Sequence, residues 1–263
     1  MKRHEITKPI GLIGLCEKVE NVCKNARVYK CGLRPQHLIV PLSAGSGRTT
    51  FIEYMTDMYK EYGILDFSGS PDDYIEAIID GSSSRSIIQG FDTFRAGAVY
   101  RNDYSNVAAV NIEDMAKYLM APQFSDFIKE AKELCRNAYV VFFVSSTPSS
   151  NEEKLIAKLV DAIGKNNIHR AYFEKYTTED ICCLIEKSVA EHGVMIENYQ
   201  LFHTTLMDVV QNFNIDEIKA AMELTEELIH YSDFSQFIPT MSEKSLTLLA
   251  EYWNKKTERN EIK

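Results

Sequence analysis

One stretch near the amino terminus, LIVPLSAGSGRTT at residues 38–50, constrains the fold more than any other. An apolar run enters a turn that contains two glycines, and a helical pattern follows the turn over residues 49–62. Near-continuous apolar character is typical of a strand buried on both faces of a parallel sheet, so we predict a strand at residues 37–42. A strand, a tight turn and a helix in this order favour an α/β fold.

The first two-thirds of the chain repeats this alternation of short apolar runs and helical patterns. Further strands are predicted at residues 64–67, 107–112 and 139–144, with residues 86–91 as another candidate. Helices are predicted at residues 123–136 and, with Asn151 as N-cap, at residues 152–163. Ser70-Pro71-Asp72-Asp73 has the order of a helix start, with a serine cap, a proline and acids near the positive end. It predicts a helix that carries Tyr74 and ends at Gly81.

The last third of the chain is helical in pattern. Thr177-Thr178-Glu179-Asp180 is similar to a capping box, and it predicts a helix that ends near Gly193. Two or three more helices are predicted, near residues 200–213, 216–231 and 242–256. We therefore predict a parallel sheet with helices on both faces over residues 1–173, followed by an all-α domain over residues 174–263.

Composition limits the classes of function and partner. A net charge of −9 offers no basic surplus for nucleic acid or an anionic membrane. The six cysteines form no Cys-x-x-Cys pair and no zinc-type spacing, which indicates unpaired thiols in a reducing compartment. The most apolar run, residues 138–144, is too short to cross a bilayer. We expect a soluble, cytoplasmic protein without a membrane segment.

The turn itself, Gly45-Ser46-Gly47-Arg48-Thr49-Thr50, resembles a phosphate-binding loop. In such a loop, backbone N–H groups surround an anion at a helix N-terminus. A lysine reaches the terminal phosphates, and a Ser or Thr hydroxyl holds magnesium. Here Thr49 stands in the metal position, Arg48 replaces the lysine, and Leu42 replaces the first glycine of the pattern. The alternative is a strand-to-helix turn that needs glycines for its geometry alone.

Three further features make the chain resemble the AAA+ ATPases, in particular the CbxX-type branch (rubisco-activase-like and sporulation stage V protein K-like). Residues 10–15, IGLIGL, are similar to the segment that surrounds the adenine, with Leu12 and Ile13 as contacts, and residues 32–37 are similar to the lead-in. Residues 139–146 are similar to the strand that ends in the sensor-1 residue, here Ser145 or Ser146. Residues 171–180 are similar to the entry to the helical lid. The resemblance covers residues 8–230 and implies ATP or ADP with Mg²⁺ as cofactors.

The departures from this family fall on its catalytic positions. The family ends one strand in Asp-Glu, with the Asp supporting magnesium and the Glu orienting the attacking water. This chain has Glu113-Asp114 instead. The resemblance assigns Glu113 to the metal together with Thr49, and Glu113, Asp114 and Ser146 to catalysis. Carboxylates displaced by about an ångström can cost catalysis heavily. A solvated acidic strand end is the alternative.

Two cations of the family are also missing. No Ser-Arg-Phe arginine-finger motif precedes the lid, and Arg170 lies out of register for that role. Residues 212–218, NFNIDEI, carry acids where the lid would have an arginine. Tyr74 is placed near the aromatic pore loop of hexameric relatives, although the helix start at Ser70 favours ordinary packing.

These features together predict an AAA+-like nucleotide-binding protein with weak or absent ATPase activity, acting in a protein assembly. An active remodelling ATPase is one alternative. An interaction module that has lost nucleotide is the other. The resemblance implies a protein partner or substrate and a homo- or hetero-oligomer, whereas nucleic acid and membrane are not indicated.

Overall fold

A computed structural model describes residues 6–29, 37–65, 74–96, 107–173, 175–233, 239–242, 244–248 and 251. The chain divides into two compact units, Met1–Glu174 and Lys175–Lys263. Each unit is described by itself.

The first unit is built on a five-stranded sheet in which every neighbouring pair of strands is parallel. Its strands lie in the order β2-β3-β4-β1-β5. They are β1 (His37–Pro41), β2 (Tyr74–Ile78), β3 (Val107–Asn111), β4 (Tyr139–Val144) and β5 (Ile168–Arg170). All residues of β1, β3 and β4 are buried, which explains their continuous apolar character. The predictions of these three strands are confirmed to within one residue.

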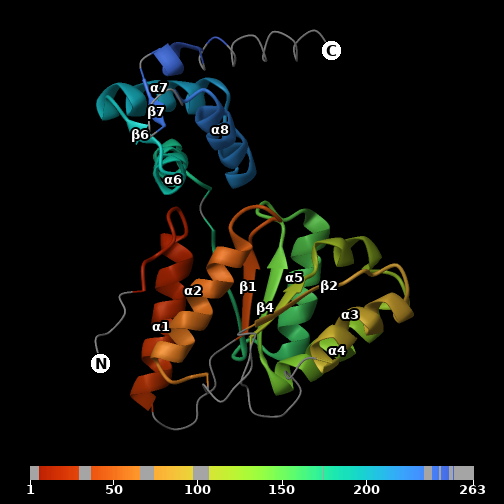
Figure 1. Cartoon of the computed structure of the whole chain (residues 1–263). Coiled ribbons are helices and arrows are strands. Elements are labelled where there is room, and N and C mark those ends of the chain that lie inside the picture. Colours follow the sequence, from red (N-terminus) through yellow and green to blue (C-terminus); the bar gives the residue numbers. More distant parts are fainter. Residues whose placement is uncertain are drawn as a thin grey trace. The chain divides into compact units, whose positions relative to one another are not determined.

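Helices cover both faces of this sheet, as Figure 1 shows. They are α1 (Ile13–Tyr29), α2 (Arg48–Glu61), α3 (Ser84–Ala96), α4 (Phe124–Asn137) and α5 (Ser150–Ile163). The connection from β1 to β2 crosses the sheet in one direction, whereas those from β2 to β3, β3 to β4 and β4 to β5 cross in the other. Because such crossovers are right-handed, α2 lies on the face opposite to α3, α4 and α5. Accordingly α1 packs on α2, and α4 packs on α3 and α5.

The segment from residue 74 to residue 78 corrects a prediction, because it is the edge strand β2 and not a helix. Ala77 and Ile79 are buried against the core, while the side chain of Ile78 between them is 67% exposed. This alternation has the period of two that a half-buried strand requires. The expected strand at 64–67 is not present at Ile64 and Leu65, whose N–H groups close the turn after α2. Residues 66–73 lie outside the described part.

Two further predictions are corrected. Residues 86–91 belong to helix α3, whose buried residues Ile87, Phe91 and Phe94 follow the helical spacing of four and three. The N-cap of α5 is Ser149 rather than Asn151. The Ser149 hydroxyl accepts the N–H of Glu152, and the Glu152 carboxylate accepts the N–H of Ser149, which is a complete capping box.

The described part of the second unit contains three long helices, a short helical segment at residues 244–248 and a small sheet. The helices are α6 (Thr178–Glu191), α7 (Tyr199–Asn212) and α8 (Ile218–His230), and α6 packs against the other two. The capping box of Thr177 and Asp180 is confirmed at the start of α6. A short parallel pair, β6 (Met195–Ile196) and β7 (Thr240–Met241), adds to the expected helical architecture. Of the helix expected at 242–256, residues 244–248 are helical and residues 252–263 lie outside the described part.

Within the described ranges, no helix combines the length and the apolar character needed to cross a membrane.

Candidate phosphate-binding site

The glycine turn after β1 has the backbone of an anion-binding loop. Gly45 and Gly47 have φ angles of 80° and 84°, a region that side chains with a Cβ rarely adopt. Gly47 is the N-cap of α2, and the first turn of this helix contains no acidic residue. The side chains of Thr49 and Thr50 are exposed there. Free N–H groups and the positive helix end therefore favour an anion at this position.

Arg48, the first residue of α2, does not follow this pattern because its side chain points into the protein and is 6% exposed. Its Nε donates a hydrogen bond to the carbonyl oxygen of Leu42. Its Nη2 lies 2.5 Å from Oε1 of Glu113, and its guanidinium carbon lies 5.2 Å from the centre of the Phe143 ring. Burial lowers the pKa of Arg48, while the charge of Glu113 opposes that shift. The basic residue of the loop is thus paired internally.

The two acids after β3 face different partners. The N–H of Glu113 donates to Oδ1 of Asn111 at 3.1 Å, which helps to begin a short 3₁₀ helix, η2 (Glu113–Tyr118). Glu113 is turned to Arg48, whereas Asp114 pairs with Lys117 at 2.5 Å on the exposed side of η2. The structure therefore does not bring the two carboxylates together as a pair.

Ser146, at the end of β4, is joined to the loop by reciprocal hydrogen bonds. The Ser43 N–H donates to the Ser146 hydroxyl at 3.0 Å, and the Ser146 N–H donates to the Ser43 hydroxyl at 2.9 Å. Two backbone segments that are far apart in the sequence are fixed to each other in this way. Ser146, one of the two sensor-1 candidates from the resemblance, thus lies beside Ser43 at the start of the loop.

Glu152 is a site residue that the sequence interpretation missed. Its carboxylate accepts hydrogen bonds from the N–H and the hydroxyl of Ser145, and from the N–H of Ser149 at 2.8 Å. Burial acts to raise the pKa of Glu152, but these hydrogen bonds outweigh it and lower the pKa overall. The signal was present, since Ser149 and Glu152 have the Ser-x-x-Glu spacing of a capping box.

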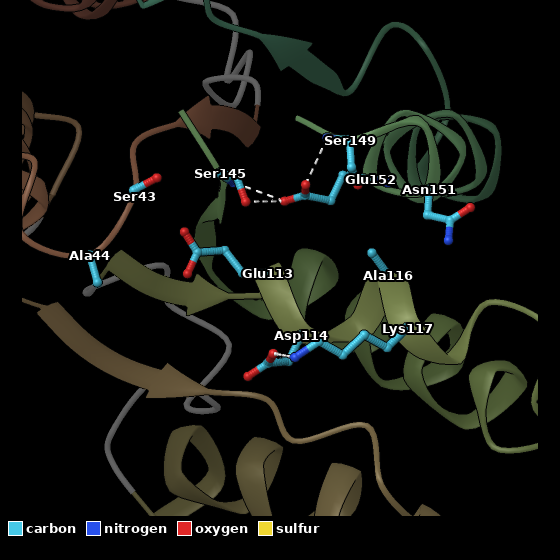
Figure 2. A pocket seen from close by; sticks show the side chains of 10 residues that line it. All are labelled: Ser43, Ala44, Glu113, Asp114, Ala116, Lys117, Ser145, Ser149, Asn151 and Glu152. Atoms are coloured by element: carbon cyan, nitrogen blue, oxygen red, sulfur yellow. Dashed lines mark hydrogen bonds and ion pairs between the residues drawn. The ribbon is translucent and has the colours of Figure 1, made fainter. Parts of the chain in front are cut away.

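A pocket of about 540 Å³ opens beside these groups, at the carboxyl ends of β1, β3 and β4. Figure 2 shows the side chains that line it. They are Ser43, Ala44, Glu113, Asp114, Ala116, Lys117, Ser145, Ser149, Asn151 and Glu152. Carboxylates from η2 and α5 thus face the same space, and the basic residue of the lining, Lys117, is paired with Asp114. The connections that leave the neighbouring strands β1 and β4 run in opposite directions across the sheet. Ligands usually bind beside such a pair of strands in open α/β sheets.

The expected adenine contacts lie at the start of α1. Leu12 is buried, while the side chain of Ile13 is 53% exposed. The segment before α1 is fastened by Lys8, whose Nζ lies 2.9 Å from the carboxylate of Glu20 on α1. The same carboxylate accepts the hydroxyl of Tyr54 on α2 at 3.1 Å. This part of the chain is therefore held against α2, the helix that follows the loop.

The remaining positions singled out from the sequence have ordinary structural partners. Arg170 donates both terminal nitrogens to Glu153 at 2.7 Å. Asp216, in the segment where the lid would carry an arginine, lies 3.3 Å from Nζ of Lys175. Tyr74 is the first residue of strand β2 and is paired with Val107.

The donor set fits a phosphate better than it fits magnesium. The loop offers N–H groups at the start of α2, whereas the carboxylate expected to support the metal, Glu113, already binds a guanidinium. In the described part of the chain, no cluster of three or more His, Cys, Asp or Glu side chains could hold a metal ion. The magnesium site at Thr49 and Glu113 stays a prediction, and in this structure Glu113 faces Arg48.

A comparison with protein-family models finds no match, and a sequence search of curated proteins finds none either. Solved structures do match. The Thermotoga maritima RuvB Holliday junction branch migration motor has a TM-score of 0.60 and 12% identity, covering 92% of this chain and 70% of that chain. C. elegans PCH-2 has a TM-score of 0.56 and 12% identity, covering 93% and 69%. Domain III of the Thermotoga maritima replication initiation protein DnaA has a TM-score of 0.54 and 14% identity, covering 94% of each chain.

At these identities the likeness concerns the fold. The five-stranded parallel sheet with the glycine loop after β1, followed by a helical unit, is the AAA+ architecture that the sequence predicts. This chain therefore has the AAA+ fold.

Proposed function

We propose that this protein is a nucleotide-binding AAA+-like component of a protein assembly, with weak or absent ATPase activity. ATP or ADP is the proposed ligand, held by the loop from Gly45 to Thr50 and by Leu12 and Ile13. The proposal also includes membership of the CbxX-type branch and a cytoplasmic location. It includes a protein partner or substrate and a homo- or hetero-oligomer.

The observation that carries the proposal is the ion pair between Arg48 and Glu113. In an active site of this type, the loop cation binds phosphate and the strand acid supports magnesium. Here the buried guanidinium of Arg48 and the partly exposed carboxylate of Glu113 neutralise each other. Phosphoryl transfer depends on positioned charges. A site in which neither the loop cation nor the strand acid faces the nucleotide therefore supports binding far better than turnover.

Nucleotide binding and hydrolysis test the proposal separately. Isothermal calorimetry with ATP and ADP should show binding, while phosphate release in the presence of Mg²⁺ should stay at the level of a loop variant. Gly47→Val is a suitable loop variant, because valine rarely adopts the φ angle of 84° that Gly47 has in the turn. Absence of any nucleotide binding would sink the proposal and favour the interaction module.

The active remodelling ATPase remains the second candidate because the loop geometry and the pocket at the strand ends both support a nucleotide site. If this candidate is right, the purified protein hydrolyses ATP with Mg²⁺ and Arg48→Ala abolishes the activity. Hydrolysis that persists in Arg48→Ala would point to a contaminant and would support neither reading.

A further inference from the structure

The charges around the loop also indicate which phosphate ligand it accepts. This inference rests on the proposed nucleotide site. We propose that the loop binds a nucleoside diphosphate without magnesium, in preference to a magnesium-bound triphosphate.

The first reason is that the cation of the loop, Arg48, is already paired with an acid of the protein. A terminal phosphate needs a cation beside it, supplied by the loop lysine and by a divalent metal. Arg48 is anchored at three points, by the carbonyl of Leu42, the carboxylate of Glu113 and the ring of Phe143. The guanidinium therefore neutralises Glu113 within the protein, so that neither group is available to a terminal phosphate or a metal.

The second reason is the charge of the adjoining pocket. The loop residues Ser43 and Ala44 line the same space as the carboxylates of Glu113, Asp114 and Glu152. Glu152 is held ionised by three hydrogen bonds from Ser145 and Ser149. Glu113 and Asp114 are paired with Arg48 and Lys117, so Glu152 is the carboxylate of this pocket that no printed ion pair neutralises. A third phosphate that extended from the loop towards the ends of β3 and β4 would bring further negative charge towards Glu152, and like charges in one pocket oppose binding.

The third reason is that the groups left for binding suit a shorter phosphate chain. The N–H groups at the start of α2 form a cradle at the helix N-terminus that needs neither a lysine nor a metal. Such a cradle holds the phosphate that lies within the glycine turn. The cradle contributes equally to the affinity for a diphosphate and for a triphosphate. The difference between the two affinities therefore comes from the acidic pocket.

Calorimetry with four titrations tests the proposal directly, using ADP and ATP, each with excess Mg²⁺ and with a chelator. We expect ADP to bind about tenfold more tightly than ATP, since one like-charge pair across a partly screened gap has an effect of this order. We expect Mg²⁺ to change the ADP affinity by less than about twofold, because the donor set offers it no site.

Glu113→Gln probes the mechanism, because it removes the charged partner of Arg48 and leaves the guanidinium available to a terminal phosphate. The variant should bind ATP about tenfold more tightly than the wild type does. The ratio of the ADP affinity to the ATP affinity should therefore fall. Asp57→Asn is the matched control, since Asp57 is an exposed acid on the same helix as Arg48. This control should leave the ratio of the two affinities unchanged. Thermal melts of both variants show that they are folded under the binding conditions.

The outcomes separate this inference from the proposed function. ATP binding that Mg²⁺ strengthens to or beyond the affinity for ADP overturns the inference and leaves the nucleotide site intact. An unchanged affinity ratio in Glu113→Gln also overturns it. Failure of both nucleotides to bind overturns the inference and the proposed function together.

Discussion

The ion pair between Arg48 and Glu113 predicts a measurable coupling in stability. Two unit charges about 4 Å apart interact by roughly 4 kcal/mol at an effective dielectric constant near 20. The side chain of Glu113 is 26% exposed, so solvent screening reduces the expected value to about 2 kcal/mol. Removal of Glu113 leaves the buried charge of Arg48 unpaired, and removal of Arg48 leaves an unpaired, partly exposed carboxylate. Glu113→Gln and Arg48→Met should therefore each lower the free energy of unfolding by about 2 kcal/mol.

The double variant distinguishes a paired charge from two independent contributions. Once one partner is gone, removal of the other should cost little, so the double variant should be about as stable as either single variant. A change of about 2 kcal/mol corresponds to a fall of about 4–8 °C in Tm for a domain of this size. Differential scanning calorimetry and urea unfolding followed by circular dichroism measure it.

The exposed pair of Asp114 and Lys117 provides the control. Its side chains are 56% and 71% exposed, so solvent screening should leave no resolvable coupling in the same cycle there. If the losses of the Arg48 and Glu113 variants simply add, or if their coupling is no larger than in the control, the reasoning about a buried pair is refuted.

Three other predictions concern Glu152, His203 and the catalytic positions. Glu152→Gln should lower the free energy of unfolding by about 2 kcal/mol near neutral pH. The pKa of Glu152 in the folded protein lies below its ordinary value of 4.5, so the difference in stability between wild type and variant should shrink as pH falls towards and through that lowered pKa. Urea unfolding at pH 7 and pH 4 would show it. The hydrogen bond that His203 donates to the Glu186 carboxylate raises the pKa of His203 above its ordinary value of 6.5. The stabilisation from this bond is therefore complete below pH 6.5 and is lost as pH rises through the raised pKa. Thermal melts should thus separate wild type from His203→Gln more at pH 5.5 than at pH 8.5. Arg48→Lys with Glu113→Asp and Asp114→Glu should make ATP binding respond to Mg²⁺ in calorimetry, whereas Arg48→Lys alone should not.

The strand, turn and helix at the glycine loop were predictable because each part carries a strong local signal. β1 is buried on both faces and reads as an unbroken apolar run, and Gly47 is required by its φ angle. The same holds for β3 and β4, which are the inner strands of the sheet. The start of α6 was equally clear, since Thr177 and Asp180 have the residue types of a capping box.

β2 was not predictable because it is an edge strand with a mixed surface. Its apolar residues at positions 74, 75, 78 and 79 are also spaced as on a helix, and the capping signal at residues 70–73 favoured that interpretation. Tertiary pairing with β3 decides the conformation instead. α3 was missed for the opposite reason, since its helical spacing was present in Ile87, Phe91 and Phe94 but the run around it looked like a strand.

The departures in the candidate site were visible as residue types, but their relation was not. Arg48 and Glu113 are 65 residues apart in the sequence. The sequence left open whether Arg48 binds a phosphate or turns to an acidic neighbour, and the resemblance assigned Glu113 to the metal. Arginine is longer than the lysine of the family pattern, and glutamate is longer than the expected aspartate by one methylene. The two longer side chains meet across the interior at 2.5 Å. Two substitutions that look like separate losses in the sequence therefore form one interaction in the structure, which is why we expect restoring the lysine alone to leave an unpaired glutamate and no metal site.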